Sequence, residues 1–267
     1  MLHQFLISGE AMIQNLFIKN KMYLTHSNFI IGFVINFFLI FIFRKIPIMT
    51  NNGWFSAGTL GTILWGCLNW QGWITVVLYL LFGTLVTKIG YEYKNQIGIA
   101  EKRGGCRGPE NVWGSAATGL FMAILIKLNF ANIVLLKIGF AASFAAKLAD
   151  TFGSEIGKRY GKNTFLITSF KKVKRGTEGA ISLEGTMASL VGSILMTYIM
   201  FFFGFLTLKN QLFIVSISGL LATIFESYIG AKFQDKLNLS NEAVNAIQTS
   251  ISSTLAILFY KLFFINP

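Results

Sequence analysis

Charged side chains are scarce in this sequence. Only 13% of the 267 residues are Asp, Glu, Lys or Arg, whereas 54% are hydrophobic and the mean hydropathy is +0.60. A soluble domain usually carries about 25% charged residues, so the composition excludes an ordinary soluble core. Apolar runs recur along the whole length, which favours one integral membrane domain over a soluble domain with a single anchor.

Proline, cysteine and histidine are also rare, and each shortage excludes a class of protein. Three prolines leave long helices uninterrupted, and the continuous apolar runs lack the alternation of an outer-membrane β-barrel. The two cysteines, Cys67 and Cys106, fit neither a disulfide framework nor a zinc site. The sequence contains no Walker A, GxSxG or HExxH pattern, so the common nucleotide, hydrolase and metalloprotease motifs are absent.

The apolar runs predict an all-α fold, a polytopic transmembrane helical bundle with about eight spans, or seven if the short second span is re-entrant. The expected spans are Asn28–Phe43, Trp54–Leu68, Trp73–Thr87, Trp113–Leu128, Phe130–Ala149, Leu183–Leu208, Leu212–Ala231 and Ala243–Phe264. Residues 28–267 are expected to form a single integral membrane domain. Residues 1–27 are interpreted as an interfacial helix, or as a segment that precedes a later start at Met12 or Met22.

Basic residues are concentrated in four of the expected loops. Arg44–Gly53, Lys88–Val112, Asp150–Ser182 and Lys232–Glu242 hold 16 of the 23 Lys and Arg residues. Such asymmetry is expected to place these loops in the cytoplasm or stroma, with a plasma membrane or a thylakoid membrane both open. The net charge of +12 is therefore attributed to topology and to anionic headgroups, with membrane lipids and no nucleic acid as expected partners.

Acidic residues gather on the same side, which topology alone does not require. Ten of the eleven Asp and Glu residues lie in those loops or at their helix ends. Carboxylates mixed with Lys and Arg at helix ends indicate a polar site. The alternative is a set of solvated loops held by ion pairs.

The stretch from Ala145 to Ser193 is the richest in candidate residues. Asp150 ends a mostly apolar helix, and an ionisable group at such depth is a functional-site hypothesis by default. Gly153 and Gly157 share a helical face with Asp150, where a ligand or a neighbouring helix can approach closely. Helix packing alone is the alternative reading.

A basic run and a Gly- and Thr-rich element follow Asp150. The basic run includes Lys171, Lys172, Lys174 and Arg175, and the small residues are Gly176, Thr177, Gly179, Gly185 and Thr186. Free backbone N–H groups at a helix start suit phosphate. Glu178 and Glu184 flank this segment, and carboxylates beside phosphate-binding groups are the parts of a nucleotide–magnesium site. A capping box with ion pairs is the alternative.

Two smaller constellations lie on the same face. The Gly-rich basic loop from Glu101 to Asn111 has the character to wrap an anionic group. Glu226, near the inner end of the seventh span, is followed by Ser227 and Gly230, which echoes the acidic and small residues after Asp150.

Four elements resemble a known membrane family. They are LADTFGSEIG (148–157), GTEGAISLEGTMAS (176–189), ESYIGAKFQ (226–234) and NEAVNAIQT (241–249). They are similar to the family that includes transmembrane protein 19 of animals and the phytyl-phosphate kinases of chloroplasts and cyanobacteria. The EGT element also resembles that of the CTP-dependent polyprenol kinases. The resemblance covers nearly the whole chain after about Ile30.

This resemblance implies an enzyme of phytol metabolism and tocopherol biosynthesis. A phytyl-phosphate kinase transfers a phosphoryl group from a nucleoside triphosphate, with CTP expected, to an isoprenoid monophosphate and yields the diphosphate. Mg²⁺ is the expected cofactor. The acceptor phosphate is already substantially ionised at pH 7, since its second pKa is about 6, so catalysis would consist mainly of positioning and charge neutralisation.

The roles that follow are hypotheses on this reading. Asp150 and Glu184 would hold Mg²⁺, and Glu178 would be the base for a free-alcohol acceptor. Arg103, Arg107 and Asn111 would bind the acceptor phosphate. The nucleotide and its phosphates would be bound by Gly153, Gly157, Lys171, Lys172, Lys174, Arg175, Gly176, Thr177, Gly179, Gly185 and Thr186. The isoprenoid tail would lie along the small faces of the fifth and sixth spans.

Three other functions compete with the kinase. A transporter or other lipid-handling protein would place its polar groups near the bilayer midplane, whereas these carboxylates lie at one edge. A cytidylyltransferase would use similar groups and release pyrophosphate. A non-enzymatic scaffold would tolerate Asp150→Asn and Glu184→Gln.

Overall fold

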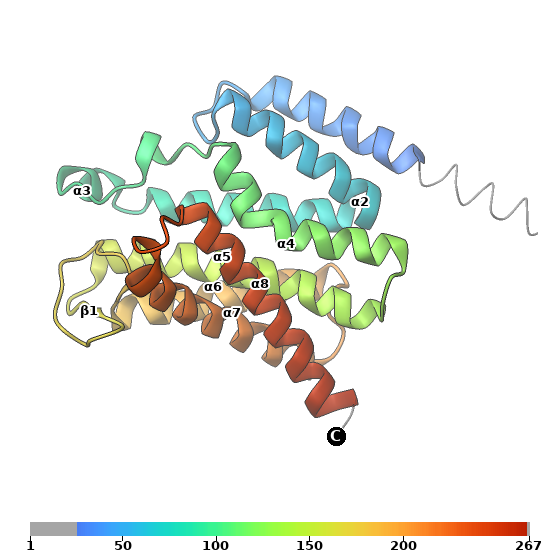
Figure 1. The fold of residues 1–267 in the computed structure, drawn as a ribbon. Coiled ribbons are helices and arrows are strands. Elements are labelled where there is room, and N and C mark those ends of the chain that lie inside the picture. Colours follow the sequence, from blue (N-terminus) through green and yellow to red (C-terminus); the bar gives the residue numbers. More distant parts are fainter. Residues whose placement is uncertain (1–25, 266–267) are drawn as a thin grey trace, which may run out of the picture.

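The computed structural model describes residues 26–265, and the predicted N-terminal segment therefore lies almost wholly outside the described residues. Apart from one two-stranded hairpin, the regular structure in this range is helical, which confirms the all-α membrane fold (Figure 1). Six helices are long and apolar enough to cross a membrane. They are His26–Phe43, Asn51–Lys88, Pro109–Leu128, Leu183–Phe202, Lys209–Gln234 and Asn241–Phe264.

The second of these helices, α2 (Asn51–Lys88), is two helices joined by a sharp turn. Asn69 interrupts it with φ 57° and ψ −165°, and the chain folds back there, as Figure 1 shows. The rings of Trp65 and Trp73, one in each arm, are 5.4 Å apart. At 1.5 Å per residue each arm is about 27 Å long, close to the hydrocarbon thickness of a bilayer. The two arms correspond to the second and third expected spans.

The central helix, α5 (Ile133–Tyr160), is longer than the expected span Phe130–Ala149. Its middle is enclosed by other helices, and Phe140, Phe144 and Leu148 are fully buried. Beyond Ala149 the helix continues for three turns because its polar residues face a cavity between helices instead of lipid. With the two arms of α2 and with α5, the described residues contain the eight long helices that the apolar runs predict.

α5 packs closely against α6 (Leu183–Phe202) through small residues. A Cβ on Gly192 would lie 2.8 Å from the carbonyl oxygen of Leu148, and one on Gly153 would collide with the hydroxyl of Ser189. This contact leaves no space for an isoprenoid tail between α5 and α6 at these residues, contrary to the expectation from the sequence.

The remaining elements complete the bundle. They are α3 (Tyr91–Gln96), η1 (Lys102–Gly105), α4 (Pro109–Leu128), β1 (Phe165–Leu166), β2 (Ala180–Ile181), α7 (Lys209–Ile229), η2 (Gly230–Gln234), α8 (Asn241–Tyr260) and η3 (Lys261–Ile265). Side-chain caps fix several helix starts: Ser182 accepts from the amide of Gly185 at 3.1 Å, and Ser240 accepts from that of Ala243 at 3.1 Å.

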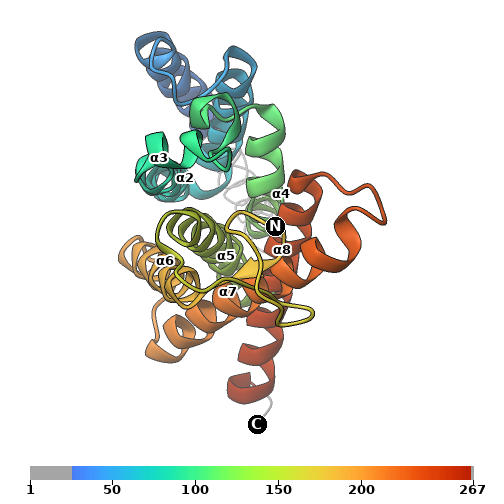
Figure 2. The same ribbon diagram turned by 90° about the vertical axis from the view of Figure 1, so that its left-hand side faces the viewer.

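The four polar loops expected on one side of the membrane meet at one end of the bundle, which Figure 2 shows from outside. Thr50 donates its amide to the carbonyl of Arg107 at 3.0 Å, which ties the first loop to the second. The β1–β2 hairpin covers the ends of α5 and α6, and the loop after η2 leads into α8 beside it. The grouping of the charged loops is thus a property of the fold.

Candidate functional site

A cavity of about 810 Å³ opens among these loops and penetrates between the helix ends. Seven of its lining residues are acidic: Glu101, Glu110, Asp150, Glu155, Glu178, Glu226 and Glu242. Six are basic: Lys102, Arg103, Arg107, Lys147, Lys158 and Arg175. The polar face predicted from the sequence is therefore a concave site lined by both charges, as binding sites for charged small molecules usually are.

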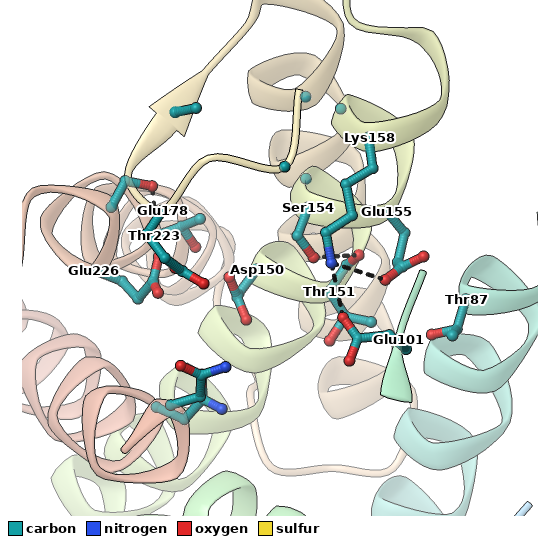
Figure 3. Close-up of a pocket in the computed structure, with 18 of the residues that line it drawn as sticks. Thr87, Glu101, Asp150, Thr151, Ser154, Glu155, Lys158, Glu178, Thr223 and Glu226 are labelled. Carbon is teal, nitrogen blue, oxygen red and sulfur yellow. Dashed lines mark hydrogen bonds and ion pairs between the residues drawn. The ribbon is translucent and has the colours of Figure 1, made fainter. Parts of the chain in front are cut away.

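On one side of the cavity the carboxylates are neutralised by lysines: Glu101, Glu155 and Lys158 line it (Figure 3). Together with Lys94, which pairs with Glu155 from outside the lining, we call them the paired side. Lys94 is fully buried, forms an ion pair with the buried Glu155 and donates to the carbonyl of Thr87 at 2.9 Å. The Lys158 ammonium lies 2.8 Å from Glu101 and 3.7 Å from Glu155. These bonds fasten α3 and the 97–105 segment to α5.

The charge of Lys158 changes the titration of Glu101. Partial burial disfavours the charged form of this carboxyl, but the Lys158 ammonium outweighs that effect and lowers the pKa of Glu101 below its usual value. Glu101 is therefore ionised at neutral pH and matched by a cation of the same molecule.

On the other side, which we call the open side, Asp150, Glu178 and Glu226 come from α5, the turn before β2, and α7 (Figure 3). Neither Glu178 nor Glu226 forms an ion pair with any Lys or Arg in residues 26–265. Asp150 pairs with Lys147 at 2.5 Å. Desolvation raises the pKa of Glu178, and the nearby charge of Asp150 raises it further. These carboxylates repel one another and lack a full set of cations.

Local sequence explains why Glu178 reaches this position. Gly179 has a φ of +70°, which suits glycine, and a Cβ there would lie 2.5 Å from the carbonyl oxygen of Ser227. The turn therefore rests directly on the end of α7, beside Glu226. The amides of Gly176, Glu178 and Gly179 donate to no other group within the described residues.

Arg107, Lys147 and Asn245 line the part of the cavity that we call its floor, and Tyr79 of α2 lies outside the lining and contacts Arg107. Arg107 donates to the Tyr79 hydroxyl at 3.0 Å, and its guanidinium lies 5.5 Å from the centre of that ring. Lys147 donates to Asp150 at 2.5 Å and to Asn245 at 2.7 Å. Two cations therefore lie in this part of the cavity wall.

Most of the predicted site residues line this cavity. They are Arg103, Arg107, Asn111, Asp150, Gly153, Gly157, Arg175, Gly176, Thr177, Glu178, Gly179, Gly185 and Thr186. Lys171, Lys172 and Lys174 lie outside the lining and are exposed in the hairpin loop. Glu184 is also outside the lining, so the structure does not bring it into the cavity with Asp150.

Lys147, Lys158, Glu226 and Asn245 line the cavity but were not among the predicted site residues, although the sequence had singled out Glu226 on the polar face. The echo between the segments after Asp150 and Glu226 was a usable signal for Glu226. The sequence contains no such signal for Tyr79 or Lys147, because each lies in an apolar helix whose other residues are typical of helix packing.

The open side suits a divalent cation that is held jointly with a ligand. Asp150, Glu178 and Glu226 offer hard oxygen donors, which Mg²⁺ prefers. Within the described residues no group of three Asp, Glu, His or Cys side chains is close enough to hold a metal unaided. Mg²⁺ is usually bound by one or two carboxylates together with water and substrate phosphates, and that arrangement fits these residues.

The fold and the site define a class: a helical integral membrane protein with a charged cavity at one membrane face. The chain belongs to the integral membrane protein family DUF92, whose model matches residues 34–253. It is 42% identical over 228 residues to the "uncharacterized membrane protein sll0875" of Synechocystis sp., covering 84% of this chain and 88% of that protein. It is 40% identical over 237 residues to "Protein VTE6, chloroplastic" of Arabidopsis thaliana, covering 85% and 71%.

A more distant relative comes from an archaeon. The "uncharacterized membrane protein MJ0933" of Methanocaldococcus jannaschii is 31% identical over 219 residues, covering 81% of this chain and 88% of that protein. No solved structure matches the chain. The family membership confirms the resemblance seen in the motifs.

Proposed function

We propose that this protein is an isoprenoid-phosphate kinase, which transfers the terminal phosphoryl group of a nucleoside triphosphate to an isoprenoid monophosphate. The observation that carries the proposal is the open side: carboxylates short of cations in a cavity that also holds basic residues and a helix N-terminus. The motif resemblance to phytyl-phosphate kinases and the 40% identity to the chloroplastic VTE6 protein support it. CTP is the donor we expect, and a phytyl chain the first acceptor to test.

The donor would occupy the mouth of the cavity between α6 and the hairpin. The start of α6 presents Gly185 and Thr186 to the cavity, and a helix N-terminus favours phosphate. The free amides of the turn from Gly176 to Gly179 add further donors, and Arg175 lies beside them. Asp150, Glu178 and Glu226 would hold Mg²⁺, whose charge would neutralise the phosphate oxygens when it is bound.

The reaction itself requires little proton transfer by the protein. An oxygen of the acceptor phosphate forms a bond to the terminal phosphorus of the donor as the bond to the bridging oxygen breaks, which yields the isoprenoid diphosphate and the nucleoside diphosphate. Since the acceptor phosphate is largely ionised at neutral pH, the residues mainly align two anions and offset their repulsion. The six basic residues of the cavity would serve that task together with Mg²⁺, whose charge would offset the carboxylates of the open side.

The charge distribution supports a cavity that faces the cytoplasm or stroma. The loops that form it carry most of the basic residues, and such loops usually stay on that side of the membrane. Both substrates would then be available, since nucleotide is dissolved there and the lipid headgroup lies at the surface. This orientation is part of the proposal.

The test is product analysis with purified protein in detergent. Protein, Mg²⁺ and phytyl monophosphate are incubated with each of the four labelled nucleoside triphosphates, with Asp150→Asn as the control. We expect labelled phytyl diphosphate with at least one nucleotide and at least a hundredfold less with the variant, as for other charge-stabilising groups. A folded protein that yields no diphosphate with phytyl, farnesyl or geranylgeranyl acceptors would refute the kinase, and release of pyrophosphate would indicate a cytidylyltransferase.

A further inference from the structure

The floor of the cavity contains two cations, Arg107 and Lys147, and each has a hydrogen-bond donor that is not used within residues 26–265. We propose that Arg107 and Lys147 form a binding site for the phosphate of the acceptor lipid, with Tyr79 as the residue that positions Arg107, and that this site is separate from the donor phosphates at the cavity mouth. The identity of the lipid rests on the proposed function, whereas the existence of a phosphate site does not.

Arg107 has unused hydrogen-bond donors and no carboxylate partner among the described residues. Its guanidinium has five N–H groups and makes one hydrogen bond, to the Tyr79 hydroxyl at 3.0 Å. No carboxylate lies within ion-pairing distance of it in the described part of the chain. The planar fork of an arginine matches two oxygens of a phosphate, so its unused donors are suited to this ligand.

Arg103, four residues earlier, shows the contrast. It forms an ion pair with Glu110 and donates to the side-chain oxygen of Asn111 at 2.9 Å. Asn111 in turn donates to Glu242 at 3.2 Å and accepts from the amide of Gly108 at 2.9 Å. The sequence suggests three residues for the acceptor phosphate. Arg103 and Asn111 are already bound to these partners within the protein, whereas the Arg107 guanidinium is not.

Lys147 supplies the second cation. The residue is 6% exposed, and an ammonium group this deep in a membrane protein is costly unless it is functional or well paired. Two of its three protons go to Asp150 and Asn245, which leaves one donor in the lining of the cavity. A phosphate oxygen would complete its hydrogen bonding.

Tyr79 positions the first of these cations. It is 4% exposed and its hydroxyl accepts from Arg107 at 3.0 Å, so it holds the guanidinium at the wall of the cavity that Lys147 also lines. A phosphate monoester, with a charge of about −1.5 to −2 near pH 7, matches two cations.

Depth favours the lipid over the nucleotide as the source of this phosphate. Tyr79 lies nine residues before the end of α2 at Lys88, which corresponds to about 14 Å along the helix. A headgroup anchored by an apolar chain can occupy that level, whereas a nucleotide is hydrated and enters from the mouth. The mouth already offers the α6 N-terminus and the free amides for its phosphates.

The experiment measures binding without turnover. Purified protein in detergent is titrated with phytyl monophosphate in the presence of a chelator and without nucleotide, and binding is followed as thermal stabilisation. We expect Arg107→Gln and Lys147→Met each to raise the Kd for phytyl monophosphate about tenfold to a hundredfold, the range for loss of a charged hydrogen bond. Tyr79→Phe, which keeps the ring packing, should raise it severalfold.

Controls separate this site from general electrostatics. Arg44→Gln removes an exposed arginine outside the cavity and should leave the Kd within about twofold of the wild-type value. Phytol, which lacks the phosphate, should bind the wild type and Arg107→Gln equally. A nucleoside triphosphate with Mg²⁺ should bind Arg107→Gln and Tyr79→Phe with a Kd within about threefold of the wild-type value.

Unchanged binding of phytyl monophosphate by folded Arg107→Gln and Lys147→Met would overturn the inference. Selective loss of nucleotide binding would assign the floor to the donor and overturn it equally. The readout needs no product, so a protein that binds the lipid phosphate through these residues yet makes no diphosphate would refute the kinase and leave the floor site standing.

Discussion

The two sides of the cavity use the same residue type in opposite ways. On the paired side, Glu155 and Glu101 are matched by Lys94 and Lys158, and the bonds join α3 and the 97–105 segment to α5. On the open side, Glu178 and Glu226 have no such cation in residues 26–265. The comparison separates the carboxylates that are paired within the protein from those that have no Lys or Arg partner of their own in that range.

The largest effect should come from neutralising the open side. Glu226→Gln removes a carboxylate that lies near Asp150 and Glu178, so we expect activity to fall about 10²–10³-fold while thermal stability is unchanged or higher. Product formation and the Tm of the purified variant are measured together. A variant that unfolds more readily, with activity lost only in proportion, would place Glu226 on the structural side of the comparison.

The same substitution on the paired side should act on stability. Glu155→Gln leaves the fully buried Lys94 without its counter-charge, and we expect a loss of about 3–5 kcal/mol in the free energy of unfolding. Denaturant or thermal unfolding in detergent measures it.

A second variant makes that prediction specific. Lys94→Met combined with Glu155→Gln removes both charges and should recover much of the stability lost in the single variant, because no unpaired buried charge remains. If the double variant is less stable than Glu155→Gln alone, the ion pair is not the reason for the loss.

The smallest effect should come from the exposed edge of the paired side. Glu101→Gln breaks a half-exposed ion pair with Lys158, which is worth about 0.2–1 kcal/mol. Since the folded-state pKa of Glu101 is lowered, this contribution is present above the unfolded value of 4.5 and is lost as the pH falls through the folded value. Wild type and variant should therefore differ in Tm at pH 7 and converge in strongly acidic buffer.

The sequence predicted the helices well because hydropathy reports burial in lipid directly. Most expected spans begin and end within a few residues of the observed helices, and the turn at Asn69 separates the two short ones. The exception is α5, whose final turns are polar and therefore read as loop. Periodicity along one helix does not show that a second helix and a hairpin enclose those turns.

The site was predicted in outline from motifs, but its pairings were not. The basic run at Lys171, Lys172 and Lys174 is dense in sequence yet lies outside the cavity, because these side chains are exposed in the loop between β1 and β2. Lys94 reads as a loop residue and is fully buried. Partners separated by 61 residues, as Lys94 and Glu155 are, are set by the packing of α3 on α5, and local sequence contains no signal for it.

The gathering of all four charged loops at one end has a consequence for lipid traffic. Under the proposed reaction, the protein can phosphorylate only those acceptors whose headgroups lie in the leaflet on that side. An isoprenoid monophosphate in the opposite leaflet would have to flip before it became a substrate, and its diphosphate product would be released asymmetrically. The geometry of the loops would thus make the bilayer's two leaflets chemically unequal.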